Sequence, residues 1–213
     1  MDLRPRGNPP PFLPERAHGC RNSACQGERK PMTAVHEEVL IGGALVRLRQ
    51  KRVSDAPADY RWRSDPEMAA FDAAGPLRAS YQDYLVLYKE ELRYPGPYRH
   101  MFAIETLEAR HIGNVMYYNI DERRGEAELG ITIGERDFWS RGYGREAIKL
   151  FIELIFSTTA LKRIYLNTLE WNTRAQRAFK AAGFSPCGRR RREGNAFITM
   201  EVLRPHGLDG AAD

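Results

Sequence analysis

The spacing of apolar and polar positions changes several times along the chain, and each change marks an expected element. Strict alternation with β-branched and aromatic residues predicts strands. These fall at residues 39–52, 100–106, 111–120, 125–133 and 162–169, with a final hairpin over 189–203. Apolar residues three and four positions apart predict helices. These fall at residues 55–71 with a break at Asp65-Pro66, 80–93, 143–156 and 172–184.

The order of these elements indicates the fold class. The strand-like segments between residues 100 and 133 are joined by short turns, as in antiparallel hairpins. The helix from residue 143 joins two strands that must run locally parallel, because a strand-helix-strand crossover keeps the strand direction. We therefore expect one α/β (α+β) domain over residues 36–204, with a mixed, mostly antiparallel sheet and a central β-α-β crossover. Residues 1–35 and 205–213 are expected to be disordered tails.

Composition narrows the class of protein. The chain of 213 residues has 42% hydrophobic residues and a net charge of +5, which is ordinary for a water-soluble domain. It has no apolar run of 18 residues and no secretory signal at its start, so we expect a cytoplasmic protein without a membrane partner. His18, Cys20 and Cys25 supply only three ligands in a proline-rich tail, and we expect no metal site.

The stretch FWSRGYGREA at residues 138–147 places two glycines at the start of a predicted helix. Each glycine costs about 1 kcal/mol there relative to alanine. A helix N-terminus presents unpaired N–H groups, and glycine lets a ligand approach the backbone closely. The stretch can therefore be an anion cradle, with Arg141 and Arg145 adding charge. A tight turn with solvated arginines is the alternative that these residues leave open.

A dinucleotide-binding fingerprint is a rival interpretation of the same glycines. Gly142, Gly144 and Ala147 have its spacing, and Glu170 ends the next strand as a candidate ribose ligand. That fingerprint normally opens a doubly wound parallel sheet. Here antiparallel strands precede it, and only about forty residues follow Glu170, so the other parallel strands have no room.

Five segments in order resemble the GNAT N-acetyltransferase superfamily, in the branch of ribosomal-protein N-terminal acetyltransferases and related small-molecule acetyltransferases. They are VLIGGALVRLRQKRVSD, YRWRSDPEMAAF, HIGNVMYYNID with GEAELGITI, FWSRGYGREA, and NTRAQRAFKAAGF. The resemblance covers residues 39–203. It implies a sheet in which two neighbouring strands, at about 128–134 and 164–169, splay apart to admit acetyl-CoA as co-substrate.

The resemblance also implies which residues bind the coenzyme. The pyrophosphate would lie on the loop made of Trp139, Ser140, Arg141, Gly142, Tyr143, Gly144 and Arg145. The pantetheine arm would follow the strand edges that carry Ile131, Ile133 and Asn167, and a backbone N–H near Ile131 would polarise the thioester carbonyl. Asn172 would hydrogen-bond the same arm, although it equally fits a helix N-cap.

The predicted chemistry is acetyl transfer to a primary amine, which needs a base because an alkylamine is mostly protonated at neutral pH. The resemblance implies that the strand with LGITI carries the base, so Glu128 is the first candidate. Glu126, on the same face, is the second, and Glu128 also fits a solvent-facing strand glutamate. The family often has a tyrosine that protonates the CoA thiolate, where this chain has Phe179. Tyr143, Tyr117 and Tyr118 are candidate donors, or the thiolate leaves unassisted.

Charge suggests an acceptor site and two alternative functions. Between Ser54 and Leu92 eight acidic and four basic residues give an excess of four negative charges, which could attract a cationic amine or a protein N-terminus. A solvated helix pair is the plainer interpretation. The alternatives to the enzyme are a CoA-binding sensor without turnover, favoured by Phe179, and a nucleic-acid-binding protein using Arg189–Arg192, which fit a charged sheet edge better. A homodimer is plausible from the resemblance alone.

Overall fold

The computed structural model describes residues 39–205, and the predicted tail over 1–35 lies outside the described residues. The strands are β1 (Val39–Gly42), β2 (Val46–Gln50), β3 (Arg99–Thr106), β4 (His111–Asp121), β5 (Glu126–Ile133), β6 (Arg163–Leu169), β7 (Ser185–Arg192) and β8 (Asn195–Leu203). The helices are α1 (Ala56–Ser64), α2 (Pro66–Phe71), α3 (Tyr81–Arg93), α4 (Tyr143–Thr158) and α5 (Thr173–Ala181). Short 3-10 turns, η1 (Val53–Asp55) and η2 (Arg136–Phe138), precede α1 and α4.

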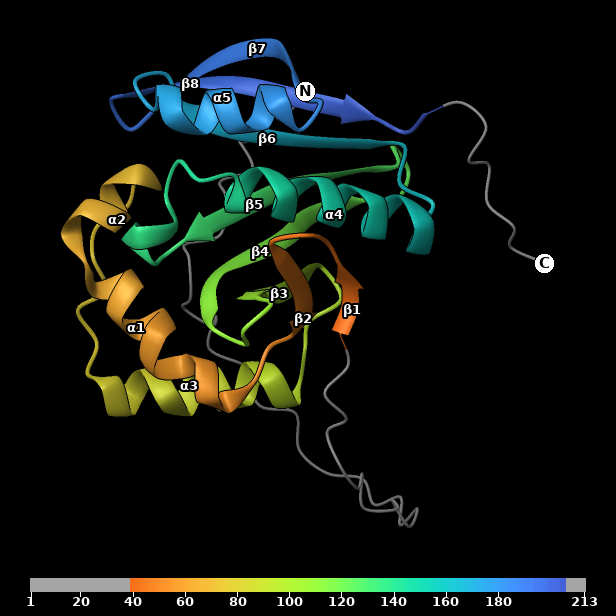
Figure 1. Ribbon diagram of the computed structural model, residues 1–213. Coiled ribbons are helices and arrows are strands. Elements are labelled where there is room, and N and C mark those ends of the chain that lie inside the picture. Colours follow the sequence, from red (N-terminus) through yellow and green to blue (C-terminus); the bar gives the residue numbers. More distant parts are fainter. Residues whose placement is uncertain (1–38, 206–213) are drawn as a thin grey trace, which may run out of the picture. The chain divides into compact units, whose positions relative to one another are not determined.

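The strands form one sheet in the order β1-β2-β3-β4-β5-β6-β8-β7. Every neighbouring pair is antiparallel except β5 and β6, which α4 connects in a crossover (Figure 1). The parallel ladder joins only residues 126–128 of β5 to residues 163–165 of β6. Beyond it, β5 stays paired with β4 and β6 with β8, so the two strands separate. The predicted fold class, crossover and splayed pair are confirmed.

The first predicted strand is wrong in one respect. Residues 39–52 form a hairpin of β1 and β2 rather than one strand, and Gly43 donates its N–H to the Val46 carbonyl at 2.8 Å to close the turn. An added Cβ at Gly43 would lie 2.0 Å from Glu146 Oε1. The glycine therefore makes the turn and also leaves room for the first turn of α4.

Capping residues explain where the helices begin. Asp65 ends α1 and starts α2, because Pro66 cannot continue the first helix and the Asp65 carboxylate accepts N–H groups of Glu67 and Met68. Ser80 caps α3 in the same way through the N–H of Asp83. The break predicted at Asp65-Pro66 is therefore confirmed as the boundary between α1 and α2.

Helices α4 and α5 lie on one face of the sheet, in front of it in Figure 1. The apolar face of α4, including Ile148, Phe151 and Ile155, is fully buried against residues such as Leu48 and Ile164. Burial of each such side chain contributes about 1.5–3 kcal/mol. This packing fixes the N-terminal end of α4 beside the end of β5.

A buried ionic network joins the opposite face of the sheet to α1 and α3. Arg49 of β2 binds Asp55 with two hydrogen bonds of 2.8 and 2.9 Å and reaches Glu105 of β3 at 3.1 Å. Lys51 binds Asp59 of α1 at 2.6 Å, and Tyr88 of α3 donates to the same carboxylate at 3.0 Å. Each buried charge has an opposite partner, as burial requires. The network holds the helical pair in register with the sheet.

Strand β7 forms one outer edge of the sheet. All its residues, Arg189–Arg192 included, are exposed, so the expected alternation buries neither face. Charged edge strands resist pairing with another chain. Within residues 39–205, no helix is long and apolar enough to cross a membrane.

Candidate active site

The N-terminal end of α4 forms the predicted anion cradle. Gly142 is the N-cap residue with φ of +92°, a left-handed conformation that glycine adopts without strain, and Ser140 also has a positive φ of 59°. Among the described residues no side chain caps this helix. Its first N–H groups are therefore available to an anion, together with the positive end of the helix dipole. Arg141 and Arg145 are exposed beside them.

Gly144 has a different reason to be glycine. An added Cβ would meet only Ile133, at 3.4 Å and 3.9 Å, which is ordinary contact. Protein packing therefore does not require a glycine at this position. The space on this side of the helix start is compatible with close approach of a ligand to the backbone.

The separation of β5 and β6 supplies the predicted binding edges. The parallel ladder ends at Glu128 and Tyr165, so beyond them the edge of β5 that faces β6 has no partner strand. Ile131 and Ile133 lie on this stretch, with their side chains packed toward the α4 core. They can therefore contact a ligand through the backbone. Trp139 Nε1 donates to the Ile133 carbonyl at 2.6 Å, which anchors the cradle loop to the end of β5.

Glu128 lies at the point where the two strands part. Its side chain is on the face opposite α4, and the residue is only 3% exposed. Oε1 accepts a hydrogen bond from Asn167 Nδ2 of β6 at 2.7 Å, and Oε2 accepts one from Asn119 Nδ2 of β4 at 3.0 Å. Tyr118 also hydrogen-bonds this carboxylate. The expectation of a solvent-facing glutamate therefore does not hold, since three neighbouring side chains orient the group.

A β-bulge brings Tyr118 and Asn119 to the same carboxylate. Consecutive strand residues normally face opposite sides of a sheet. The β4–β5 register shifts between Tyr118 and Asp121, and Asn119 has φ of +51°. The irregularity turns the Asn119 side chain back toward Glu128, which is what bulges near functional sites commonly do. No periodicity in the sequence signals this arrangement.

The phenol of Tyr118 is in an unusual environment. Burial first, and then the charge and hydrogen bond of Glu128, raises its pKa well above the ordinary value. Its ring lies over Gly130, where an added Cβ would come within 3.3 Å of Tyr118 Cε1. Gly130 thus makes room for the ring along β5, one residue before Ile131.

Other predicted residues have definite structural partners. Glu126 binds Arg163 Nη1 at 2.5 Å, so its carboxylate is occupied by an ion pair. Asn172 caps α5 by accepting the N–H of Ala175 at 3.2 Å, which confirms the N-cap alternative. Asn167 contacts Glu128 and accepts a hydrogen bond from Thr199 at 2.9 Å. Its side chain therefore orients the carboxylate, while binding of the pantetheine arm by the backbone edge of β6 stays a prediction.

Phe179 is confined to the core. It is 8% exposed and packs edge-on against Phe184, with ring centroids 5.9 Å apart. The position of the family's tyrosine is thus filled by a buried ring without a proton to donate.

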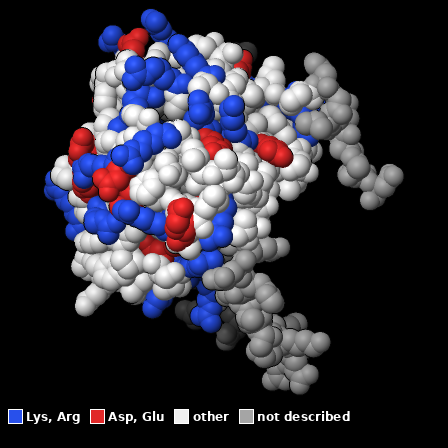
Figure 2. Space-filling view, viewed as in Figure 1, with Lys and Arg blue, Asp and Glu red and all other residues white. Residues whose placement is uncertain are grey.

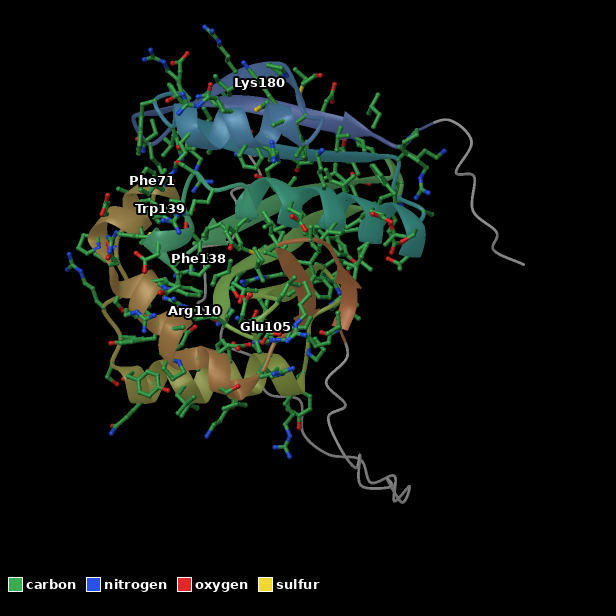
Figure 3. The ribbon with its side chains drawn as sticks, viewed as in Figure 1. Phe71, Glu105, Arg110, Phe138, Trp139 and Lys180 are labelled. Atoms are coloured by element: carbon green, nitrogen blue, oxygen red, sulfur yellow. The ribbon has the colours of Figure 1, made fainter. Side chains whose placement is uncertain are left out.

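An aromatic cluster that sequence reasoning missed lies beside the cradle. Phe71 of α2 contacts Trp139 at a centroid distance of 5.8 Å (Figure 3). It also contacts Trp171, at 5.4 Å. Arg174 of α5 lies over the Trp139 ring at 3.7 Å and over Phe71 at 4.9 Å. The cluster joins α2, the cradle loop and the β6–α5 connection. Its members are far apart in sequence, so no local pattern predicts the cluster.

Most of the acidic residues between Ser54 and Leu92, which suggested an acceptor site, make structural contacts. Asp55 and Asp59 are buried in the ionic network, and Asp83 lies at the start of α3 with a hydrogen bond from Ser80. Asp65 and Glu67 both bind Arg136, at 2.8 and 2.6 Å. The excess of negative charge in the sequence therefore does not describe the charge of an open surface.

Asp72 is an exposed acid of this region that acts on the environment of Glu128. It is the C-cap residue of α2, and its charge acts on Arg63 and Tyr118. Desolvation by the surrounding protein raises its pKa to about 6, against the charge of Arg63. Its charge in turn contributes to the raised pKa of Tyr118. Asp72 is therefore close enough to Tyr118 for its charge to act on that phenol.

Basic side chains cover another part of the surface. Figure 2 shows Lys and Arg gathered over α5 and the β7–β8 edge. A groove of about 420 Å³ lies there, lined by Gln176, Lys180, Pro186, Gly188, Arg189, Ile198 and Met200. In the described part of the chain, no group of three or more His, Cys, Asp or Glu side chains is placed to hold a metal ion.

Comparison with known proteins decides the family. The model of the acetyltransferase (GNAT) domain matches residues 46–185, which span β2 to the start of β7. The chain belongs to the GNAT acetyltransferase family. It is an N-acetyltransferase, and its co-substrate is acetyl-CoA. The predicted resemblance is confirmed, and the family match covers the cradle, the splayed strands and Glu128 together.

Relatives of this acetyltransferase are distant in sequence. An uncharacterized N-acetyltransferase p20 from Bacillus licheniformis is 26% identical over 142 residues, covering 66% of this chain and 79% of that protein. The spermidine N-acetyltransferase of Vibrio cholerae, solved with CoA and spermine, superimposes with a TM-score of 0.66 at 20% identity. That match covers 74% of this chain and 95% of the other. The aminoglycoside acetyltransferase AAC(6')-Ib, solved with coenzyme A, gives 0.63 at 18% identity over 75% and 95% of the two chains.

Proposed function

We propose that this acetyltransferase transfers the acetyl group of acetyl-CoA to a primary amine, with Glu128 as the general base. The observation that carries the proposal is a buried carboxylate at the point where β5 and β6 separate. Two asparagines from neighbouring strands hold its oxygens. A carboxylate offers about four acceptor sites. Glu128 therefore retains capacity for the proton of an incoming amine.

The cradle and the parted strands are proposed to hold the coenzyme. The pyrophosphate fits the N–H groups at the start of α4, between Gly142 and Arg145, where no side chain of residues 39–205 caps the helix. The pantetheine amides then pair with the unpartnered edge of β5. A backbone N–H near Ile131 polarises the thioester carbonyl, and attack takes place beside Glu128.

Glu128 makes the amine nucleophilic. An alkylammonium ion has a pKa of about 10.4 and has no lone pair to attack with. A positioned carboxylate that removes the proton contributes roughly 10²- to 10⁴-fold in rate. Holding the amine and the thioester together adds to this, since orientation alone can supply a large part of an acceleration.

The acceptor is proposed to be a small cationic amine rather than a protein N-terminus. Asp72 is an exposed acid whose charge acts on Tyr118, the neighbour of Glu128, which favours a substrate with a second positive charge. The structural neighbours named above are a spermidine and an aminoglycoside acetyltransferase, whose substrates carry several amines. Both observations support the same chemical class.

Isothermal titration and a thiol-release assay test the proposal. The panel consists of spermine, kanamycin, glucosamine and a peptide with a free N-terminus. We expect acetyl-CoA to bind wild type and Glu128→Gln equally, whereas Glu128→Gln lowers kcat at least a hundredfold on the best amine. Glu153→Gln, an exposed glutamate on α4, is the matched control.

Each contrary outcome has a distinct meaning. Binding of acetyl-CoA without turnover of any amine would favour a CoA-binding sensor over an enzyme acting on these amines. Full activity of Glu128→Gln would remove Glu128 from the mechanism. Turnover of the peptide alone would replace the small amine with a protein N-terminus.

A further inference from the structure

The CoA thiolate needs a proton, and the residue that the family resemblance led us to expect cannot give one. Phe179 is a buried hydrocarbon ring packed on Phe184. The sequence left three tyrosines as substitutes, namely Tyr143, Tyr117 and Tyr118. The structure separates them clearly.

Two of the three tyrosines are in the wrong place. Tyr117 lies on the α4 side of the sheet, where its ring stacks on His100 at 4.7 Å and packs against the core residue Phe151. Tyr143 lies at the start of α4 and packs edge-on against Phe138 at 4.8 Å. Neither phenol is on the face that carries Glu128.

Tyr118 is on that face and already contacts the base. It is the direct cross-strand partner of Glu128 in the β4–β5 ladder, and its side chain hydrogen-bonds the carboxylate. Its ring lies over Gly130, between Glu128 and the stretch of β5 that is proposed to hold the thioester. The residue is half-buried, in contrast to the core position of Phe179.

We propose that Tyr118 donates a proton to the CoA thiolate and that Glu128 then returns a proton to Tyr118. This inference rests on the proposed function of Glu128. The alkylammonium first loses one proton to water through Glu128. As the C–N bond forms, Glu128 takes the second proton from nitrogen. The C–S bond breaks with its electron pair on sulfur; Tyr118 protonates the sulfur and receives the proton that Glu128 holds.

The direction of this proton transfer is favourable. A carboxylic acid gives up a proton far more readily than a thiol. The phenol is neutral before and after the step, so its high pKa does not oppose a relay in which both protons move together. At the end Glu128 is again a carboxylate and Tyr118 again a phenol, ready for another turnover.

Tyr118→Phe tests the inference, because it removes one oxygen and leaves the ring over Gly130. We expect kcat to fall ten- to a hundredfold on the best amine of the panel, with the acetyl-CoA Kd and both KM values within twofold of wild type. Tyr117→Phe, one residue away on the other face, is the control and should keep wild-type kcat. The solvent deuterium isotope effect on kcat should also fall in Tyr118→Phe, because two protons move together in the wild-type relay and a merely structural role would leave this effect unchanged.

The outcomes are separable from those of the proposed function. An unchanged kcat in Tyr118→Phe, or a lower kcat with an unchanged solvent isotope effect, would overturn the relay. If Glu128→Gln is inactive while Tyr118→Phe is fully active, only the relay fails. If Glu128→Gln is fully active, the proposed function itself fails. A purely structural role of Tyr118 would raise KM or weaken acetyl-CoA binding, which the titration measures.

Discussion

Gly142 and Gly144 stand one residue apart for different physical reasons. Gly142 adopts φ of +92°, so a side chain there is strained in any surroundings. At Gly144 an added Cβ has room against Ile133. A glycine that costs helix stability without a packing reason points to a ligand that approaches the backbone.

Gly144→Val is therefore expected to lower acetyl-CoA affinity at least tenfold, because its methyl groups occupy the space proposed for the pyrophosphate. The melting temperature should change by only a few degrees, since no backbone strain is introduced and the loss in helix propensity is small. Titration calorimetry and thermal unfolding measure the two effects.

Gly96→Val is the matched control, because an added Cβ at Gly96 meets nothing within 4 Å. Its acetyl-CoA affinity should equal that of wild type. Equal affinities of both variants would show that the coenzyme does not touch the start of α4.

At the scale of elements, the ionic network fixes α1 and α3 against the sheet. Burial alone would raise the pKa of Asp55, but the hydrogen bonds from Arg49, together with the charges of Lys51 and His111, lower it from 3.8 to about 2. The folded state thus binds a proton at Asp55 less tightly than the unfolded chain. Asp55 stabilises the fold above pH 4, and this stabilisation is lost as pH falls toward 2.

The expected contribution of Asp55 at neutral pH is about 2 kcal/mol in the free energy of unfolding. Urea unfolding at pH 6, 4 and 3 should show a steep loss for wild type. Asp55→Asn should be less stable at pH 6, because Arg49 loses its charged partner, and it should lose less on acidification.

Asp137→Asn, at an exposed position on η2, serves as the control and should follow the wild-type pH dependence. A variant Asp55→Asn with an unchanged slope between pH 4 and pH 3 would place the acid sensitivity elsewhere in the network.

At the scale of the whole domain, different functional groups lie around the gap between β5 and β6. The cradle and the arginines at the start of α4 are at one end of the gap, and Glu128 and Tyr118 are on the face away from α4. The aromatic cluster of Phe71, Trp139, Trp171 and Arg174 ties α2 to the loops on either side of this gap. We therefore expect a coenzyme bound in the gap to change the surroundings of this aromatic cluster.

Acetyl-CoA binding is expected to change the tryptophan emission, because two of the three tryptophans belong to this cluster. The change should disappear in Trp139→Phe/Trp171→Phe, which leaves only Trp62 in the core. A fluorescence titration in parallel with calorimetry measures it. The same emission change in the double variant would mean that the coenzyme does not reach the cluster.

The sequence by itself determined the order of the elements, the crossover, the cradle and the candidate base. The first two depend on local periodicity and the cradle on a short motif, whereas the candidate base depends on the resemblance of its strand to that of the GNAT family. The hairpin at Gly43 was missed although the Gly42-Gly43 pair between two strand-like runs is itself a turn signal.

Only the tertiary structure decided what the side chains do. The bulge at Asn119 turns two consecutive residues toward Glu128, and strand register places Tyr118 rather than Tyr117 or Tyr143 beside it. The acids of residues 54–92 look like one charged surface in the sequence, yet most are paired or capping. Strand pairing and long-range ion pairs bring together residues that are distant along the chain, and no local pattern encodes which partner each will find.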